Sequence, residues 1–202
     1  MTYLKHIHII SYPLYGRTII KYDEKLKISD TRITLRPLIP DDTDEFHTAL
    51  IESLPDLTPW VSYQDNHTIR DTRKELEQSR EKWETDESYS FGITDSTNGK
   101  ILGYCCLNRI DKQNHVANLG YWIRSSHSGK GIAPAATVLL ARWALDTCGF
   151  RRIELSIAKQ NKRSLRAAEK AGAHREGVLR NRFTTNNKSR DVVMFSFIPG
   201  DI

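Results

Sequence analysis

The stretch from Leu119 to Trp143 constrains the fold of this 202-residue chain more than any other. An aromatic and β-branched segment, residues 120–124, is followed by small residues that include Gly129 and Gly131, and then by an apolar run of helical spacing. This order predicts a strand, a tight loop and the N-terminus of a helix. Glycines let a backbone approach an anion closely, and the free N–H groups of a helix start favour negative charge. The stretch therefore predicts a phosphate-binding loop.

The loop matches neither standard nucleotide-binding motif. G-x-x-x-x-G-K-[ST] is absent, and the residue three after Gly131 is Pro134, which departs from G-x-G-x-x-G. Pro134 nevertheless fits the first turn of a helix, where its missing N–H is tolerated. A glycine loop that only turns the chain is the alternative interpretation.

Length and composition predict one globular domain. The chain has a mass of 23.2 kDa and is 39% hydrophobic, which suits a single full core. No run of about 18 apolar residues is present, and the N-terminus lacks a continuous apolar segment. The three cysteines form neither a disulfide framework nor a metal-ligand spacing, so we expect a cytoplasmic protein without a metal.

Charge is divided unevenly along the chain. Residues 100–190 hold 18 Lys and Arg against 5 Asp and Glu, a net charge of +13, and the remainder has a net charge of −8. A basic half that contains the glycine loop indicates a polyanionic cofactor, and an acidic half indicates a cationic second substrate. Chance asymmetry on solvated surfaces is the alternative.

Residue periodicity predicts a mixed fold from residue 31 onward. Strands are expected at 32–36, 88–95, 100–109, 115–124, 152–158, 178–184 and 191–198, with helices at 41–51, 68–85 and 132–148 and between Asn161 and Gly172. Asn98-Gly99 predicts a hairpin, and residues 185–188 a turn. The order predicts an α/β or α+β domain with a mostly antiparallel sheet and one crossover helix after the glycine loop.

Residues 1–30 are harder to place. A short hairpin between 18–22 and 25–28 is one interpretation, and residues 54–67 are expected to be a loop. We expect residues 1–30 to be an N-terminal extension of unknown role and residues 31–202 to form a single domain.

Five short motifs follow one another at spacings shared with a known family. They are Gly120-Tyr121-Trp122-Ile123, Gly129-Lys130-Gly131-Ile132-Ala133, Asn161-x-x-Ser164, Glu169-Lys170-x-Gly172 and Glu176-Gly177. With them, the chain resembles the GNAT superfamily of N-acetyltransferases, and more narrowly its RimJ/RimL-like (ribosomal-protein-alanine/serine acetyltransferase) branch. The resemblance implies a GNAT-like central sheet flanked by helices, with strands that splay apart near residues 123–125, and acetyl-CoA as the donor.

The resemblance also implies where acetyl-CoA binds. Its pyrophosphate would contact the loop and the helix start, and its pantetheine would lie between the splayed strands. The implied binding residues are Trp122, Ile123, Arg124, Ser128, Gly129, Lys130, Gly131, Ile132, Ala133, Asn161 and Ser164.

Two positions depart from the family pattern. Ser126 stands where the loop usually has Gln or Arg, so Lys130 and Arg124 would have to compensate electrostatically. Asn118 stands where many relatives have an acidic residue, which removes one candidate base.

Acetyl transfer to an amine needs a proton acceptor and a proton for the leaving thiolate. Glu176 and Glu154 are the candidate bases, although either also fits an ordinary salt-bridged carboxylate. Ser164 is the candidate donor to the thiolate and Asn161 a candidate pantetheine contact. An Asn helix cap followed by Ser in the first turn explains the same spacing.

We therefore predict an N-acetyltransferase that moves an acetyl group from acetyl-CoA to a primary amine by direct transfer. The acceptor, a protein N-terminus or a small-molecule amine, stays open, as does the choice between monomer and homodimer. A non-catalytic acyl-CoA-binding or partner-regulating module is the alternative. No membrane partner is expected, and nucleic acid is disfavoured because the predicted strands lack aromatic residues interleaved with basic ones.

Overall fold

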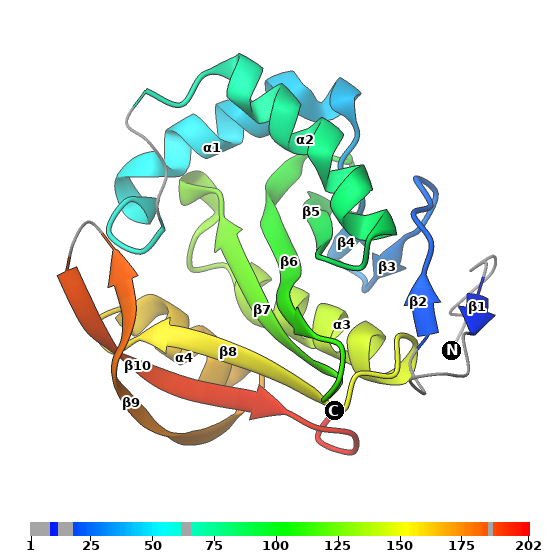
Figure 1. Cartoon of the computed structure of the whole chain (residues 1–202). Helices are drawn as coiled ribbons and strands as arrows, with labels where there is room; N and C mark the ends of the chain where they lie inside the picture. Colours follow the sequence, from blue (N-terminus) through cyan, green and yellow to red (C-terminus); the bar gives the residue numbers. More distant parts are fainter. Residues whose placement is uncertain (1–8, 12–17, 62–65, 186–187) are drawn as a thin grey trace.

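The computed structural model describes residues 9–11, 18–61, 66–185 and 188–202 and is built around an eight-stranded sheet (Figure 1). The strands lie in the order β3 (Ile28–Ser29), β4 (Ile33–Arg36), β5 (Tyr89–Asp95), β6 (Ile101–Asp111), β7 (Val116–Ile123), β8 (Arg152–Ala158), β10 (Lys188–Phe197) and β9 (His174–Thr185). Neighbouring strands are antiparallel except for β7 and β8, which are parallel. The predicted mixed, mostly antiparallel fold is confirmed.

Among the described residues, four α-helices cover the two faces of this sheet. α1 (Thr43–Leu57) and α2 (Ile69–Glu84) lie on one face, and α3 (Ile132–Asp146) and α4 (Lys162–Lys170) lie on the other (Figure 1). Short 3-10 turns occur at Pro40–Asp42 and Ser125–His127. Parallel neighbours need a crossover connection, and α3 provides it between β7 and β8, as predicted. In this part of the chain, no helix is both long enough and apolar enough to span a bilayer.

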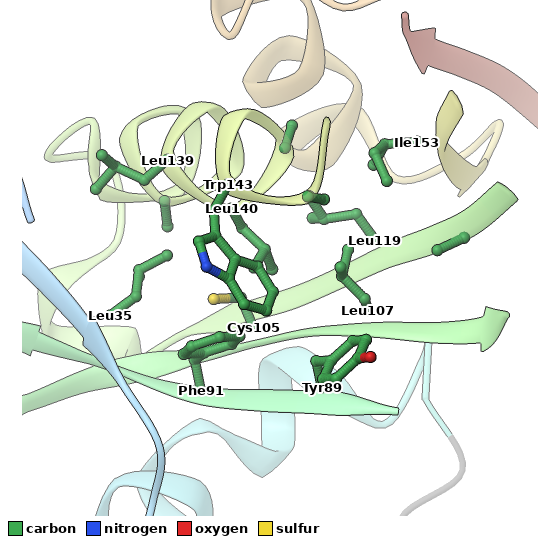
Figure 2. Close-up of a cluster of buried hydrophobic side chains, with 14 of the residues drawn as sticks. Leu35, Tyr89, Phe91, Cys105, Leu107, Leu119, Leu139, Leu140, Trp143 and Ile153 are labelled. Atoms are coloured by element: carbon green, nitrogen blue, oxygen red, sulfur yellow. The ribbon is translucent and has the colours of Figure 1, made fainter. Parts of the chain in front are cut away.

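Buried side chains fix α3 to the sheet. Leu139, Leu140 and Trp143 of α3 lie over apolar side chains that come from several strands (Figure 2). The Trp143 and Phe91 rings meet edge to face with centroids 5.2 Å apart, an arrangement that aromatic pairs favour. On the opposite face, a smaller cluster joins Phe46 of α1 to Trp122 of β7. Both helical layers are thus packed against the strands that lead to the glycine loop.

The first helix is longer than its sequence pattern predicts. α1 continues to Leu57 and includes Pro55, within a region expected to be a loop. Pro55 lies in the last turn, where the lost N–H bond and the ring disturb little of the helix. Leu54 and Leu57 pack against the cluster around Phe46, and this packing outweighs the local preference of proline. Residues 62–65 of the expected loop, and the centre of the turn expected at 185–188, lie outside the described residues.

Residues 20–28, which precede the expected domain start, belong to the same core. Ile20, Leu26 and Ile28 are buried, and the Trp83 indole N–H donates to the Ile20 carbonyl at 2.9 Å. The expected hairpin between 18–22 and 25–28 is wrong: β2 (Thr18–Ile20) pairs with β1 (Ile9–Ser11), whereas β3 pairs with β4. Contact with Trp83 holds Ile20 in the core, and periodicity over five residues contains no information about this contact. We infer that the packed domain begins before Thr31.

Candidate active site

The loop after β7 leaves a helix start open to an anion. Gly129 and Gly131 have φ angles of 80° and 77°, which glycine adopts without strain. Gly131 is the N-cap of α3, and no side chain caps this helix. The first N–H groups of α3 therefore lack a side-chain acceptor and are available to a ligand, apart from Pro134, which has none. The predicted loop residues Ser128, Lys130, Ile132 and Ala133 surround this helix start.

β7 and β8 separate soon after they pair. Their register covers only Val116 with Arg152, Ala117 with Ile153 and Asn118 with Glu154. Beyond this point residues 119–123 and 155–158 diverge (Figure 1), and we call these two segments the strand fork. Pairing ends at Asn118, which is earlier than the positions 123–125 that the family resemblance implied.

The Asn118 side chain occupies the apex of the strand fork. Its Oδ1 accepts the Ser156 N–H at 3.4 Å, and its Nδ2 donates to Asn108 Oδ1 at 2.9 Å. A continued parallel ladder would give the Ser156 N–H to a backbone carbonyl of β7. The side-chain amide takes this donor instead, which explains why the ladder stops here.

The start of α4 lies after the second arm of the fork. Asn161 caps this helix, because its Oδ1 accepts the Ser164 N–H at 3.1 Å. The Tyr121 hydroxyl of β7 donates to the Ser164 carbonyl at 3.4 Å, so the helix start lies against the first arm of the fork. The structure therefore brings Asn161 and Ser164 next to the fork, while the carbonyl of the Asn161 side chain is occupied by capping.

Arg152 binds both candidate bases. Its Nη1 and Nη2 donate to the two oxygens of Glu176 at 2.5 and 2.6 Å, and its Nε donates to Glu154 Oε1 at 2.8 Å. The Ser196 hydroxyl adds a bond to Glu176 at 2.8 Å. The bidentate bond from Arg152 is the main cause that holds the pKa of Glu176 at about 2. A carboxylate this acidic is a poor proton acceptor near neutral pH, so these contacts favour a structural role for Glu176.

Glu154 differs from Glu176 in two respects. Only its Oε1 takes part in the ion pair with Arg152. Its backbone pairs with Asn118, at the apex of the strand fork. Of the two predicted bases, Glu154 is the one whose carboxylate and position remain compatible with proton transfer.

A carboxylate of α1 engages Arg124. The Arg124 Nε donates to Glu52 Oε2 at 2.6 Å, and the Ser126 N–H donates to Glu52 Oε1 at 2.9 Å. The charge of Arg124 is therefore compensated within the chain, which weakens the expectation that it attracts phosphate in place of the missing side chain at Ser126. Lys130 is exposed on the loop and has no ion pair within the described ranges.

Trp122 and Ile123 end the first arm of the fork. The Trp122 ring is 5% exposed and packs against Phe46 and Tyr104, with centroid distances of 5.5 and 6.5 Å. The Trp122 side chain is therefore part of the core, and the backbone groups of Trp122 are the part available to a ligand. Ile123 pairs with Gly103 of β6 on the side away from the fork.

A cavity of about 890 Å³ lies between α2 and the sheet, on the face that α1 also covers. Its lining includes Phe46 of α1, Leu76 of α2 and Tyr104, Cys106 and Asn108 of β6. Burial raises the pKa of the Cys106 thiol, so this sulfur is held as a thiol rather than as a thiolate nucleophile.

The β6 residues that line the cavity are paired with the first arm of the strand fork and its apex. Cys106 pairs with Gly120, and Asn108 pairs with Asn118 at the apex of the fork. Sequence reasoning missed these residues. Tyr104, Cys106 and Asn108 alternate along one predicted strand, so their side chains lie on one face of that strand. This alternation is the signal that would have identified them.

Comparison with known proteins agrees with this geometry. Residues 32–174 match the family model described as the acetyltransferase (GNAT) domain. The "Probable N-acetyltransferase YjcK" of Bacillus subtilis (strain 168) is 31% identical over 138 residues, which cover 68% of this chain and 76% of that protein. The ribosomal-protein-serine acetyltransferase of Escherichia coli (strain K12) is 29% identical over 99 residues, 49% of this chain and 55% of that protein.

A solved structure shows the same arrangement of elements. The microcin C7 self-immunity acetyltransferase MccE, in complex with acetyl-CoA and AMP, superposes with a TM-score of 0.78 at 25% identity, covering 84% of this chain and 93% of that chain. This shared arrangement, together with the family match, puts the chain in the acetyltransferase class. The chain belongs to the acetyltransferase (GNAT) domain family and is an N-acetyltransferase. The function predicted from the sequence is confirmed at this level.

The Arg152 cluster gives a prediction about pH. Because the pKa of Glu176 falls from 4.5 to about 2 on folding, Glu176 stabilises the fold above pH 4.5, and this stability is lost as the pH falls toward 2. We expect Glu176→Gln to lower the melting temperature at pH 7 by about 2–4 °C, about 1 kcal/mol for a partly exposed pair. The difference from the wild type should shrink below pH 4.5, as followed by circular dichroism.

Glu169→Gln, an exposed acid of α4, is the matched control and should leave the melting temperature unchanged. We expect kcat of Glu176→Gln to stay within about twofold of the wild type, since general base catalysis would contribute at least about 100-fold. A large fall in kcat with an unchanged melting temperature would instead make Glu176 the general base.

Proposed function

We propose that the chain transfers the acetyl group of acetyl-CoA to the primary amine of a protein N-terminus, in one direct step. The observation that carries this proposal is the uncapped start of α3, which follows the strand fork directly in the chain. A helix start binds phosphate, and a forked pair of strands offers unpaired backbone groups to an amide-containing ligand. Acetyl-CoA has both, because its pyrophosphate is joined to a pantetheine chain with two amides.

Backbone groups supply most of the proposed donor site. The amides of Gly129, Lys130, Gly131, Ile132 and Ala133 would hold the pyrophosphate, with the Lys130 ammonium and Ser128 at the rim. Among the described strands, the arm of β7 that ends in Trp122 and Ile123 pairs with β6 alone, so its other edge would be available to pantetheine. The similarity to MccE, whose structure contains acetyl-CoA, supports this donor.

Two side chains would handle the protons of the reaction. The amine nitrogen forms a bond to the thioester carbon as the carbon–sulfur bond breaks. Glu154 would take the proton that the amine loses, directly or through water. The Ser164 hydroxyl would hydrogen-bond to the departing sulfur and give it a proton while taking one back from a water molecule. The capping bond between Asn161 and the Ser164 N–H supports this role, because it fixes the helix turn that bears the hydroxyl.

The cavity beside β6 is the proposed acceptor site. Its volume of about 890 Å³ falls in the range of small-ligand sites and is large enough for the first residues of a peptide. Its lining includes Asn108, whose partner Asn118 is at the apex of the strand fork. The similarity to a relative named ribosomal-protein-serine acetyltransferase supports a protein N-terminus as the acceptor.

Replacing a loop glycine tests the donor site. Gly129 has a φ of 80°, and no atom lies within 4 Å of a Cβ built there, so Gly129→Val acts through backbone strain alone. Gly99→Val is the matched control, because Gly99 has a φ of 75°, equally open surroundings and a place in the hairpin between β5 and β6. We expect both variants to lose roughly 1–2 kcal/mol of stability.

Only Gly129→Val should also lose the rise in melting temperature that CoA produces in the wild type. Differential scanning fluorimetry with and without CoA measures both effects. An equal stabilisation of Gly129→Val and Gly99→Val by CoA would contradict the phosphate assignment.

Ser164→Ala tests the proton donor. Loss of a general acid should lower kcat by about tenfold to 100-fold. We expect the KM for acetyl-CoA to change by less than about twofold. Ser189→Ala, on the exposed part of β10, is the control and should retain full activity. Steady-state assays of thiol release give both constants, and an unaltered kcat would remove Ser164 from the mechanism.

A panel of acceptors tests the proposed substrate. Peptides of four to six residues with free N-termini are compared with the same peptides blocked at the N-terminus and with small amines, and CoA release is followed with a thiol reagent. We expect turnover of free N-terminal peptides and none of the blocked forms. Turnover of small amines alone would reassign the acceptor, and CoA binding without turnover of any amine would contradict catalysis.

A further inference from the structure

One face of α1 is bound to the segment that joins β7 to the glycine loop. Glu52, Ser53 and Asp56 form this contact, and we call them the α1 brace. Glu52 accepts the Ser126 N–H, and Ser53 Oγ accepts the Ser125 N–H at 3.1 Å. The helical spacing of 52, 53 and 56 places these three side chains on one side of α1.

The contacts of Glu52 are strong by their geometry and charge. The Glu52 carboxylate receives the Arg124 Nε at 2.6 Å and the Ser126 N–H at 2.9 Å, each a charge-assisted bond. Bonds from Ser126 and Arg124 lower the pKa of Glu52 to about 2, so it is ionised at any working pH. The Arg124 side chain is only 11% exposed, and solvent therefore screens this pair less than an ordinary surface ion pair.

Asp56 extends the brace across the open end of the strand fork. Its Oδ2 accepts the Ser125 hydroxyl at 2.6 Å, and its Oδ1 accepts Arg163 Nη1 at 3.1 Å. Ser125 follows the first arm of the fork, and Arg163 lies in the first turn of α4, after the second arm. Exposure of the Asp56–Arg163 pair makes it weak, so Glu52 carries the main part of the brace.

We propose that Glu52 is a positioning residue for acetyl-CoA binding, which holds residues 124–126 so that the glycine loop is ordered before the ligand arrives. The inference rests on the proposed donor. Ser126 lacks the long side chain that the family usually presents to the phosphates, and its backbone is instead fixed to α1. A loop that is already ordered loses less conformational entropy on binding, which raises affinity without any contact to the ligand.

The electrostatic alternative predicts the opposite effect. Glu52 is an anion close to the site proposed for the pyrophosphate, so its removal would leave the Arg124 charge free to attract phosphate. If charge were decisive, a variant without Glu52 would bind CoA more tightly than the wild type. If positioning is decisive, the same variant binds CoA more weakly.

The test compares Glu52→Ala, Glu52→Gln and Asp44→Asn. Glu52→Gln keeps an oxygen that can accept the Ser126 N–H but loses the charge that pairs with Arg124. Asp44→Asn removes an acid from the first turn of the same helix, where acids contribute about 0.3–1 kcal/mol to stability, and leaves the loop contacts intact.

Isothermal titration of the full chain with CoA gives the affinities, and saturating assays give kcat. We expect the Kd for CoA to rise about tenfold in Glu52→Ala and by a smaller factor in Glu52→Gln. The kcat of both Glu52 variants should stay within about twofold of the wild type. Asp44→Asn should bind CoA like the wild type. Unchanged or tighter binding by both Glu52 variants overturns the inference. An equal loss of affinity in Asp44→Asn also overturns it, since the effect would then follow helix stability. Absence of CoA binding in the wild type refutes the donor assignment itself.

Discussion

The early end of the β7–β8 ladder is the constraint on which the site depends. A parallel pair normally continues along its strands, and backbone N–H and C=O groups left without partners are costly when buried. Here pairing stops at Asn118, while β6 and β10 hold the outer edges of the two arms. The structure thus keeps a polar gap in the middle of a sheet without losing the sheet. The crossover helix between the same two strands then presents its uncapped start at the end of the first arm.

Acidic and basic side chains form ion pairs with one another around this gap. Arg124 is paired with Glu52, and Arg152 with Glu176 and Glu154, so these two guanidinium charges are used in fixing the walls of the fork. The low pKa values of Glu52 and Glu176 both come from hydrogen bonds to the carboxylate, mainly from Ser126 and then Arg124 for Glu52, and mainly from Arg152 for Glu176. The net positive charge of residues 100–190 is therefore not all available to attract a polyanion, because part of this charge forms ion pairs that stabilise the protein.

Local sequence patterns predicted the conformation correctly where it depends on residues close together in the chain. Asn98-Gly99 forms the turn between β5 and β6, with Gly99 at a φ of 75°. The glycine loop and the helix after it were predicted because positive φ and a helix start depend on neighbouring residues only. Predictions failed where a distant residue decides. Trp83 fixes the position of Ile20, which sequence periodicity could not reveal. The role of Glu176 as a base stays a prediction, and its bidentate contact with the distant Arg152 disfavours it.

The sequence alone determined the class of fold, the glycine loop before a helix start and the family, because these follow from periodicity, glycine positions and motif spacing along the chain. The tertiary structure decided which charges are paired, where the two strands separate and where a cavity lies beside β6. Each of these depends on contacts between residues far apart in sequence. Glu52 and Ser126 are separated by 74 positions and are joined by one hydrogen bond. Such pairs leave no local pattern, so only the packed chain reveals them.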